Sequence, residues 1–378
     1  MVSNPFGADG DNLADSASDR SLARTVERSA QLNAEIAADP GRFRVLTGDR
    51  PTGDLHIGHY FGTLANRLAL QRQGVETWIV IADYQVIADR DGVGPIRDRV
   101  HSLITDYLAI GLDPQRTTIF THSAVPALHQ LMLPFLSLVT DAELRRNPTV
   151  KAEHDATGGR PMSGLLLTYP VHQAADVLFC KANVVPVGKD QLPHLELTRV
   201  IARRFDERFG RLDADTALFR APEAVLSEAV AILGIDGHKM SKSRGNTITL
   251  RMDADTTAQR LRTAVTDNER QITYDPEHRP EVSNLILIGA LASGRDPDQF
   301  AADIGNGGAS ALKRAVTEAL NEHLRPIRAR RTELDANTDA VGAVLAAGNR
   351  RANETADTTL AQVRTVMQMN YQQTSSLK

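Results

Sequence analysis

From Phe43 onward, short apolar segments alternate with longer segments of helical periodicity. The apolar segments predicted as strands are Phe43–Thr47, Trp78–Ala82, Thr117–Phe120 and Val184–Val187, with helices between them such as Ile57–Gln73 and Pro95–Ile110. Strands that are apolar throughout are typical of a parallel sheet whose two faces are both covered by helices. We therefore expect an α/β fold with a doubly wound, Rossmann-like parallel sheet that binds its ligands at the carboxyl ends of the strands.

The strand pattern ends near residue 250, and the segments 254–268, 284–293, 309–324 and 339–368 are predicted as helices. At the other end, residues 1–19 are polar and expected to be disordered, whereas residues 20–38 have apolar residues at helical spacing. The predicted organisation is an N-terminal extension over residues 1–40, a catalytic domain over 41–250 and a helical domain over 251–378.

Composition limits the class of protein. The chain has 378 residues, 42% of them hydrophobic, and a formal net charge of −4. The single cysteine, Cys180, excludes a disulfide within the chain and a cysteine-based zinc site. Because no apolar run is long enough to span a bilayer and no secretion signal is evident, we expect a cytoplasmic protein without a membrane partner. A negative net charge still allows nucleic-acid binding, which requires only a local basic surface.

Two histidines flank a glycine at a predicted helix start, in the run His56-Ile57-Gly58-His59. The imidazoles are three residues apart and share one face of the helix. The preceding Thr47-Gly48 and Thr52-Gly53 allow the backbone to come close to a nucleotide, because glycine has no Cβ. Helix-start N–H groups and histidine donors are suited to holding phosphate oxygens.

A second motif, Lys239-Met240-Ser241-Lys242-Ser243, lies on a polar segment that continues as Arg244-Gly245-Asn246. A solvated charge run is the alternative interpretation. Two ammonium groups on a mobile loop would neutralise charge on a departing pyrophosphate. Together, the two motifs predict an in-line displacement on the α-phosphate of ATP that forms an adenylate.

This pair of motifs resembles the HIGH and KMSKS signatures of class I aminoacyl-tRNA synthetases. The tracts Thr168–Asp176 and Pro186–Gln191 resemble those of bacterial tryptophanyl-tRNA synthetases. The run Leu46–Gly53 is most similar to a divergent second type that some bacteria carry as an auxiliary copy. The resemblance covers roughly residues 42–370.

The resemblance implies a tryptophan–tRNA ligase that uses ATP with Mg²⁺, charges tRNA(Trp), is a homodimer and binds no DNA. The residues it assigns to catalysis are His56, His59, Lys239, Lys242 and Lys151. Those it assigns to ATP binding are Thr47, Gly48, Arg50, Thr52, Gly58, Gly188, Met240, Ser241 and Ser243. It assigns anticodon recognition largely to the helical domain.

A helix is expected to begin at Pro170, which places Tyr169, Gln173 and Asp176 on one face. The Asp176 carboxylate is predicted to be buried, because it is flanked by Val171, Val177 and Leu178. Such a group needs a donor, and the indole N–H of tryptophan only donates. A purely structural aspartate is the alternative. The residues that the resemblance assigns to tryptophan binding are Leu46, Gln85, Tyr169, Gln173, Asp176, Val185, Val187, Asp190 and Gln191.

Three positions depart from the common tryptophanyl pattern. Gln173 replaces a methionine, Gln85 a histidine and Arg50 a glutamine. The change at Gln85 leads to the hypothesis of weaker binding of tryptophan-mimicking inhibitors. Because tyrosyl enzymes also use glutamine in a similar array, a tyrosyl-tRNA synthetase remains an alternative. A nucleotidyltransferase that never contacts tRNA, and a paralogue that senses tryptophan or serves as a partner protein, are the others.

The predicted tRNA surface is less specific. The basic residues in the helical region are Arg325, Arg328, Arg330, Arg331, Arg350 and Arg351. Contact with phosphates and a solvated helix face are equally open interpretations. No metal site is predicted, because the eleven histidines show no ligand spacing with carboxylates.

Overall fold

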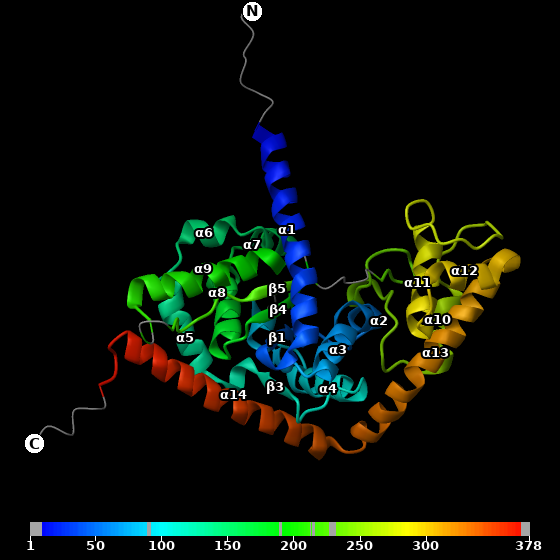
Figure 1. The fold of residues 1–378 in the computed structure, drawn as a ribbon. Helices are drawn as coiled ribbons and strands as arrows, with labels where there is room; N and C mark the ends of the chain where they lie inside the picture. The colour runs from blue at the N-terminus through cyan, green and yellow to red at the C-terminus, as the bar shows by residue number, and fades with distance from the viewer. Residues whose placement is uncertain are drawn as a thin grey trace, which may run out of the picture.

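The computed structural model describes residues 10–88, 92–188, 191–211, 213, 216–226 and 232–371. Five parallel strands form one sheet in the order β3-β2-β1-β4-β5 (Figure 1). The strands are β1 (Arg44–Asp49), β2 (Glu76–Ile81), β3 (Thr117–Thr121), β4 (Val184–Val187) and β5 (Glu223–Leu226). The predicted α/β fold is confirmed. Strand β5 was not predicted, because a four-residue run that begins with a charged side chain gives little periodicity.

Alternate residues of the central strands face opposite helical layers, as a doubly wound sheet requires. On one face, Trp78 and Phe120 pack against α5 (Pro126–Leu136), α8 (Gly164–Phe179) and α9 (Leu192–Phe209). On the other, Ile79 and Ile119 share a core with α4 (Ile96–Ala109) and the C-terminal helices. The remaining helices of this part are α6 (Asp141–Arg146), α7 (Pro148–Ala156) and the single turns η1 (Pro40–Arg42), η3 (Tyr84–Ile87) and η4 (His122–Ala124).

The helix predicted over Ile57–Gln73 is present, but it is not uniform. It comprises α2 (Ile57–His59), a π-helical segment η2 (Tyr60–Leu64) and α3 (Ala65–Gln73). The prediction that a helix begins at Pro170 was wrong. Helix α8 begins two turns earlier, because the Ser163 side chain caps it by accepting from the backbone N–H of Leu166 at 3.0 Å.

Helix α1 (Gly10–Ala38) is longer than predicted and extends away from the body of the molecule (Figure 1). Residues 10–19 are helical rather than disordered, as a helix anchored at one end propagates at little cost per residue. The anchor is formed by Leu32 and Ile36, which pack against Val225 of β5, and by an ion pair from Arg28 to Glu223. Residues 1–9 lie outside the described part of the chain.

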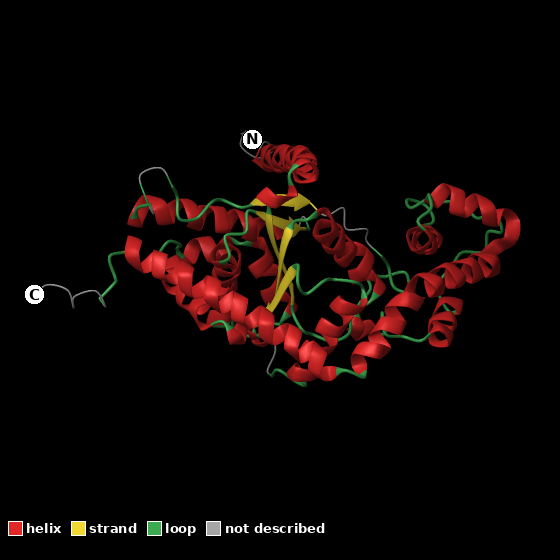
Figure 2. Ribbon diagram, turned by 60° about the horizontal axis from the view of Figure 1, so that its bottom comes forward, coloured by secondary structure: helices red, strands yellow, loops and turns green. Residues whose placement is uncertain are grey.

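Beyond residue 250 the described chain contains helices and no strand, as predicted. The helices are α10 (Ala254–Arg262), α11 (Pro280–Ser293), α12 (Pro297–Ile304), α13 (Gly308–Asp335) and α14 (Thr338–Val366), with a short turn η7 (Gly305–Gly307). Helix α13 leads away from the α10–α12 cluster, and α14 returns along β3 and α5 (Figures 1 and 2). Ala352, Ala356 and Leu360 of α14 thereby join the core that contains Trp78 and Phe120. The domain boundaries remain predictions.

No helix in the described ranges is both long and apolar enough to cross a membrane.

The contact between α14 and β3 depends on a glycine. A Cβ at Gly348 would lie 2.7 Å from the carbonyl carbon of Ile119 and 3.0 Å from its nitrogen. Because these are backbone atoms, they cannot rotate away. We expect Gly348→Ala to lower the free energy of unfolding by about 1–3 kcal/mol, measured by urea denaturation. Gly342→Ala, in the same helix with nothing within 4 Å, is the control and should be neutral or stabilising. Equal effects of the two changes would contradict this account of α14.

Candidate active site

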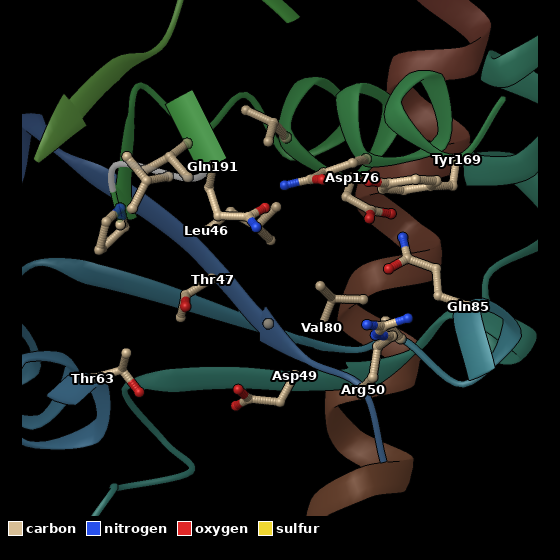
Figure 3. Close-up of a pocket in the computed structure, with 18 of the residues that line it drawn as sticks. Leu46, Thr47, Asp49, Arg50, Thr63, Val80, Gln85, Tyr169, Asp176 and Gln191 are labelled. Carbon is tan, nitrogen blue, oxygen red and sulfur yellow. The ribbon is translucent and has the colours of Figure 1, made fainter. Parts of the chain in front are cut away.

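A cavity of about 320 Å³ opens at the carboxyl ends of β1, β2 and β4 (Figure 3). Its lining includes almost every residue predicted to bind the amino acid. These are Leu46, Gln85, Tyr169, Gln173, Asp176, Val185, Val187 and Gln191. Of the predicted ATP-binding residues, Thr47, Gly48, Arg50 and Gly188 also line it. Asp190 lies outside the described residues.

One end of the cavity has aliphatic walls and a carboxylate. Asp176 is only 3% exposed, and Val80 and Val177 line the cavity near it. Asp176 and Gln85 point toward the cavity from α8 and from η3 (Figure 3). The Nε2 of His122 lies 2.8 Å from the Oδ1 of Asp176. This end can hold a flat apolar ring that carries one hydrogen-bond donor.

Tyr169 lies on the same helix face and is held by polar partners. Its hydroxyl lies 2.9 Å from the Nε2 of His194 and hydrogen bonds with Glu153 of α7. Burial, followed by the negative charge of Glu153, raises the pKa of Tyr169 above its ordinary value. Glu153 also lines the cavity, and its Oε1 is 3.7 Å from an Arg50 nitrogen. Glu153 was not predicted, because only the fold brings α7 beside α8.

The close approach of β1 and β2 requires glycine at position 48. A Cβ there would lie 2.7 Å from the carbonyl oxygen of Val80. The same backbone lines the cavity beside Thr47. Gly48 therefore allows β1 and β2 to lie close together where they line the cavity.

The two histidines of the first motif lie together at the start of α2. The backbone N–H of His56 donates to the Nδ1 of His59 at 3.2 Å, and the ring centroids are 3.6 Å apart. Burial, then the positive charge of Lys242, lowers the pKa of His59 to about 4, against the opposing effect of Asp49. Burial, His59 and Lys242 lower the pKa of His56 to about 3. Both imidazoles are therefore neutral at neutral pH.

The second motif lies against the first. The backbone N–H of Ile57 donates to the Ile248 carbonyl and that of Leu250 to the Leu55 carbonyl, both at 3.0 Å. These four side chains are buried in one core. Met240 is buried, and its sulfur would lie 3.6 Å from a Cβ at Gly58.

Lys242 extends from this second motif to the glycine-rich turn before the first. Gly53 has a φ of +134°, and the Nζ of Lys242 would lie 3.3 Å from a Cβ at that position. Substitution of Gly53 would therefore strain the backbone and crowd the ammonium group. The structure thus brings His56, His59 and Lys242 together.

Asn246 organises the second motif and was not predicted as a site residue. It is 2% exposed, and its Oδ1 accepts from the backbone N–H of Ser241 at 2.8 Å. Its Nδ2 donates to the Oδ1 of Asp236 at 2.7 Å and to the Lys239 carbonyl at 3.2 Å. Its position directly after the motif was a signal, but an asparagine beside glycine is usually read as a turn residue.

None of the described residues of the two motifs lines the cavity, and the remaining predicted residues lie apart from its lining as well. Lys239 and Lys151 are exposed, the latter on α7. Thr52 donates its backbone N–H to the Arg50 carbonyl at 2.8 Å. Ser243 lies in the turn Lys242–Arg244, and its side chain is outside the described part. Their roles remain predictions.

An ion pair at the end of β1, between the buried Arg67 and the partly buried Asp49, was also not predicted. Asp49 accepts from Arg67 of α3 and from the Tyr107 hydroxyl of α4. Burial alone would raise the pKa of Asp49, but the Arg67 guanidinium outweighs it, so the pKa is lowered. The pair fixes the end of the central strand near His59, where the glycine-containing turn before the first motif begins.

Three potential metal ligands converge behind the cavity. The ligand atoms of His122, His172 and Asp176 all lie within 4.8 Å of one another. This cluster could not be recognised from residue spacing in the sequence, because β3 and α8 are distant along the chain. Within this cluster, the Nε2 of His122 lies within hydrogen-bonding distance of the Oδ1 of Asp176, at 2.8 Å.

Several arginines of the predicted tRNA surface have partners within the protein. Arg331 is buried and pairs with Asp106 of α4, and Arg330 donates to the Ala109 carbonyl at 2.6 Å. Arg328 donates to Thr257 of α10 at 2.9 Å. Arg351 lies over the Trp78 ring, 5.4 Å from its centroid. These side chains hold α13 and α14 against their neighbours. Arg325 is exposed beside Glu322.

Comparison with known proteins gives a consistent family. Residues 39–325 match the family described as tRNA synthetases class I (W and Y). The tryptophan–tRNA ligase of Streptococcus mutans is 39% identical over 86% of this chain and 98% of its own length. That of Treponema pallidum is 39% identical over 86% of this chain and 96% of its own.

Solved structures agree with the sequence comparison. Tryptophanyl-tRNA synthetase from Campylobacter jejuni, solved with ADP and tryptophan, aligns with a TM-score of 0.73 and 29% identity. That alignment covers 85% of this chain and 98% of the other. A tyrosyl-tRNA synthetase from Archaeoglobus fulgidus aligns with a TM-score of 0.61 at 21% identity, which shows a shared fold. The chain therefore belongs to the tryptophan and tyrosine branch of the class I aminoacyl-tRNA synthetases.

Proposed function

We propose that this chain is a tryptophan–tRNA ligase, which activates tryptophan with ATP and transfers it to tRNA(Trp). The observation that carries the proposal is the buried Asp176 carboxylate at the aliphatic end of the cavity. An indole ring fits between aliphatic walls and offers one N–H donor to this acceptor. The relatives named tryptophan–tRNA ligase support the same substrate.

The rest of the amino acid would lie toward the phosphate-binding motifs. Tyr169, Gln191 and the Glu153 carboxylate line the cavity and would hold the ammonium and carboxylate groups. The tryptophan carboxylate then attacks the α-phosphate of ATP, and pyrophosphate leaves. A ribose hydroxyl of the tRNA end attacks the resulting mixed anhydride and releases AMP. Catalysis rests on positioning and charge stabilisation, without a covalent enzyme intermediate.

The phosphate end has the donors that this reaction needs. His56 and His59 present imidazole N–H groups beside the Lys242 ammonium, and Lys239 and Lys151 would join when ATP binds. These donors suit phosphate oxygens rather than a metal ion, and the nearby Asp49 carboxylate is engaged by Arg67. Mg²⁺ would therefore enter with ATP, held mainly by phosphate oxygens whose charge it neutralises.

The proposal extends to a homodimer that works in the cytoplasm. Tyr84, Ile87 and Leu133 are 43%, 45% and 72% exposed, an unusual exposure for large apolar side chains. The Tyr84 ring lies 5.1 Å from that of His129 on α5, so η3 and α5 form one surface. An interface between two copies would cover this surface.

Replacing Asp176 with asparagine tests the amino-acid pocket. The amide would present a donor or a weaker acceptor to the indole N–H, and a buried group would be left unpaired. We expect kcat/KM for tryptophan in pyrophosphate–ATP exchange to fall at least about a hundredfold, with little change in KM for ATP. Charging of purified tRNA by the wild-type chain separates the ligase from a tryptophan sensor, which would not charge. An unaltered tryptophan response in Asp176→Asn would refute the pocket assignment.

Gln85 tests the relation to the auxiliary type. It lines the cavity beside Asp176. The common tryptophanyl enzymes have a histidine at this position. We expect Gln85→His to lower the inhibition constant of a competitive indole-containing inhibitor severalfold while KM for tryptophan stays within about twofold. An unchanged inhibition constant would contradict the hypothesis that Gln85 weakens inhibitor binding.

The buried imidazoles predict a pH dependence of stability. His56 and His59 have a folded-state pKa of about 3 and about 4, below the value of 6.5 expected when unfolded. The unfolded chain therefore binds more protons below pH 6.5, and the free energy of unfolding should decrease as pH falls from there. We expect the double change His56→Asn and His59→Asn to reduce this slope between about pH 6.5 and 5, in denaturant titrations. Identical slopes in the wild type and the double variant would be the contrary result.

A further inference from the structure

Three histidines lie in a row behind the carboxylate at the aliphatic end of the cavity. His122 follows β3 directly, His129 lies on α5, and His172 lies on α8 one turn before Asp176. His122 and His172 are 0% and 3% exposed, and their ring centroids are 4.4 Å apart. Neither the family motifs nor the proposed reaction gives these side chains a role.

The hydrogen bonds between them fix the direction of each donor. The Nε2 of His129 lies 2.7 Å from the His122 carbonyl oxygen, which only accepts, so this nitrogen carries the hydrogen. In the neutral ring the Nδ1 of His129 then accepts, and the Nε2 of His172, at 2.9 Å, donates to it. Burial lowers the pKa of His172 to about 4 and also lowers that of His129, which keeps both rings neutral.

The hydrogen bond between His122 and Asp176, at the cavity, also has a fixed direction. A carboxylate only accepts, so the Nε2–H of His122 donates to the Oδ1 of Asp176. Among the described residues no protein group donates to the other oxygen, Oδ2, and Asp176 lines the cavity. Among the described residues, the buried Nδ1 atoms of His122 and His172 have no hydrogen-bond partner; with the hydrogen on Nε2, each of them is an acceptor and not a donor.

We propose that His122 is a positioning residue for the amino acid: its Nε2–H holds Oδ1 of Asp176 so that Oδ2 alone faces the indole N–H. His172 and His129 support it, because their chain of donors ends on the His122 carbonyl and fixes its backbone. A hydrogen bond to one oxygen fixes the orientation of the carboxylate, so the other oxygen has a defined position from which to accept a donor. This inference rests on the proposed function, in which Asp176 accepts from the indole ring.

The test compares two amides at position 122. In His122→Gln the amide nitrogen reaches about as far as Nε2 and still donates, whereas in His122→Asn it is too short. Tryptophan is compared with 3-benzothienylalanine, in which sulfur replaces the indole N–H, in pyrophosphate–ATP exchange. We expect His122→Asn to raise KM for tryptophan about tenfold or more, with KM for the sulfur analogue and for ATP nearly unchanged. His122→Gln should restore most of the preference for tryptophan.

The possible outcomes distinguish a failure of this inference from a failure of the proposed function on which it rests. The preference is the ratio of KM for the sulfur analogue to KM for tryptophan. If Asp176→Asn does not reduce this ratio, the assignment of Asp176 to the indole pocket fails. If Asp176→Asn narrows it but His122→Asn affects both amino acids equally, His122 is only structural and the inference is overturned. Should His122→Asn not fold, His129→Asn, whose shorter amide cannot reach the His122 carbonyl, is assayed in the same way and must narrow the preference.

Because His122, His172 and Asp176 could together bind a metal ion, a metal site is a competing explanation of their arrangement. Wild-type exchange is therefore repeated with 1,10-phenanthroline in excess Mg²⁺, which removes transition metals and leaves Mg²⁺. We expect KM for tryptophan to stay the same. A rise in KM that added Zn²⁺ reverses would identify a metal site and overturn the hydrogen-bond role.

Discussion

The active site depends on one short backbone pairing between segments that are far apart in sequence. Two hydrogen bonds at 3.0 Å, between Ile57 and Ile248 and between Leu250 and Leu55, join the start of α2 to the chain after the lysine motif. The paired side chains are buried in the core shared by the sheet and the C-terminal helices. Without this pairing, imidazole and ammonium donors would sit on unconnected loops. With it, the site can hold a triphosphate from two sides.

Burial determines what each polar group in the site can do. Desolvation keeps the two motif histidines neutral, so they act as hydrogen-bond donors while Lys242 supplies positive charge. The Asp49–Arg67 pair compensates its own burial and fixes the end of β1. His122 lies within hydrogen-bonding distance of the Oδ1 of Asp176, which leaves Oδ2 available to a donor on the ligand. The cavity lining thus combines aliphatic side chains near Asp176 with polar ones such as Thr47 and Arg50.

The sequence predicted the features that come from local pattern or known motifs. Apolar strands, the helical C-terminal region and most of the cavity lining are where the prediction put them. It did not predict contacts that arise only when distant elements meet, such as Glu153 of α7 against Tyr169 of α8, or His122 against Asp176. The helix start at Pro170 was wrong, because a serine cap at Ser163 outweighs a proline signal inside the helix. Likewise, Arg330 and Arg331 look like a nucleic-acid surface in sequence but hold α13 to α4.

The central claim is that the cavity activates tryptophan rather than another aromatic amino acid. The most direct measurement is pyrophosphate–ATP exchange by the wild-type chain, with tryptophan and tyrosine in parallel. The account predicts saturable exchange with tryptophan and none above background with tyrosine. Exchange with tyrosine alone would assign the chain to the sister enzyme, and no exchange with either would contradict adenylate formation at this site.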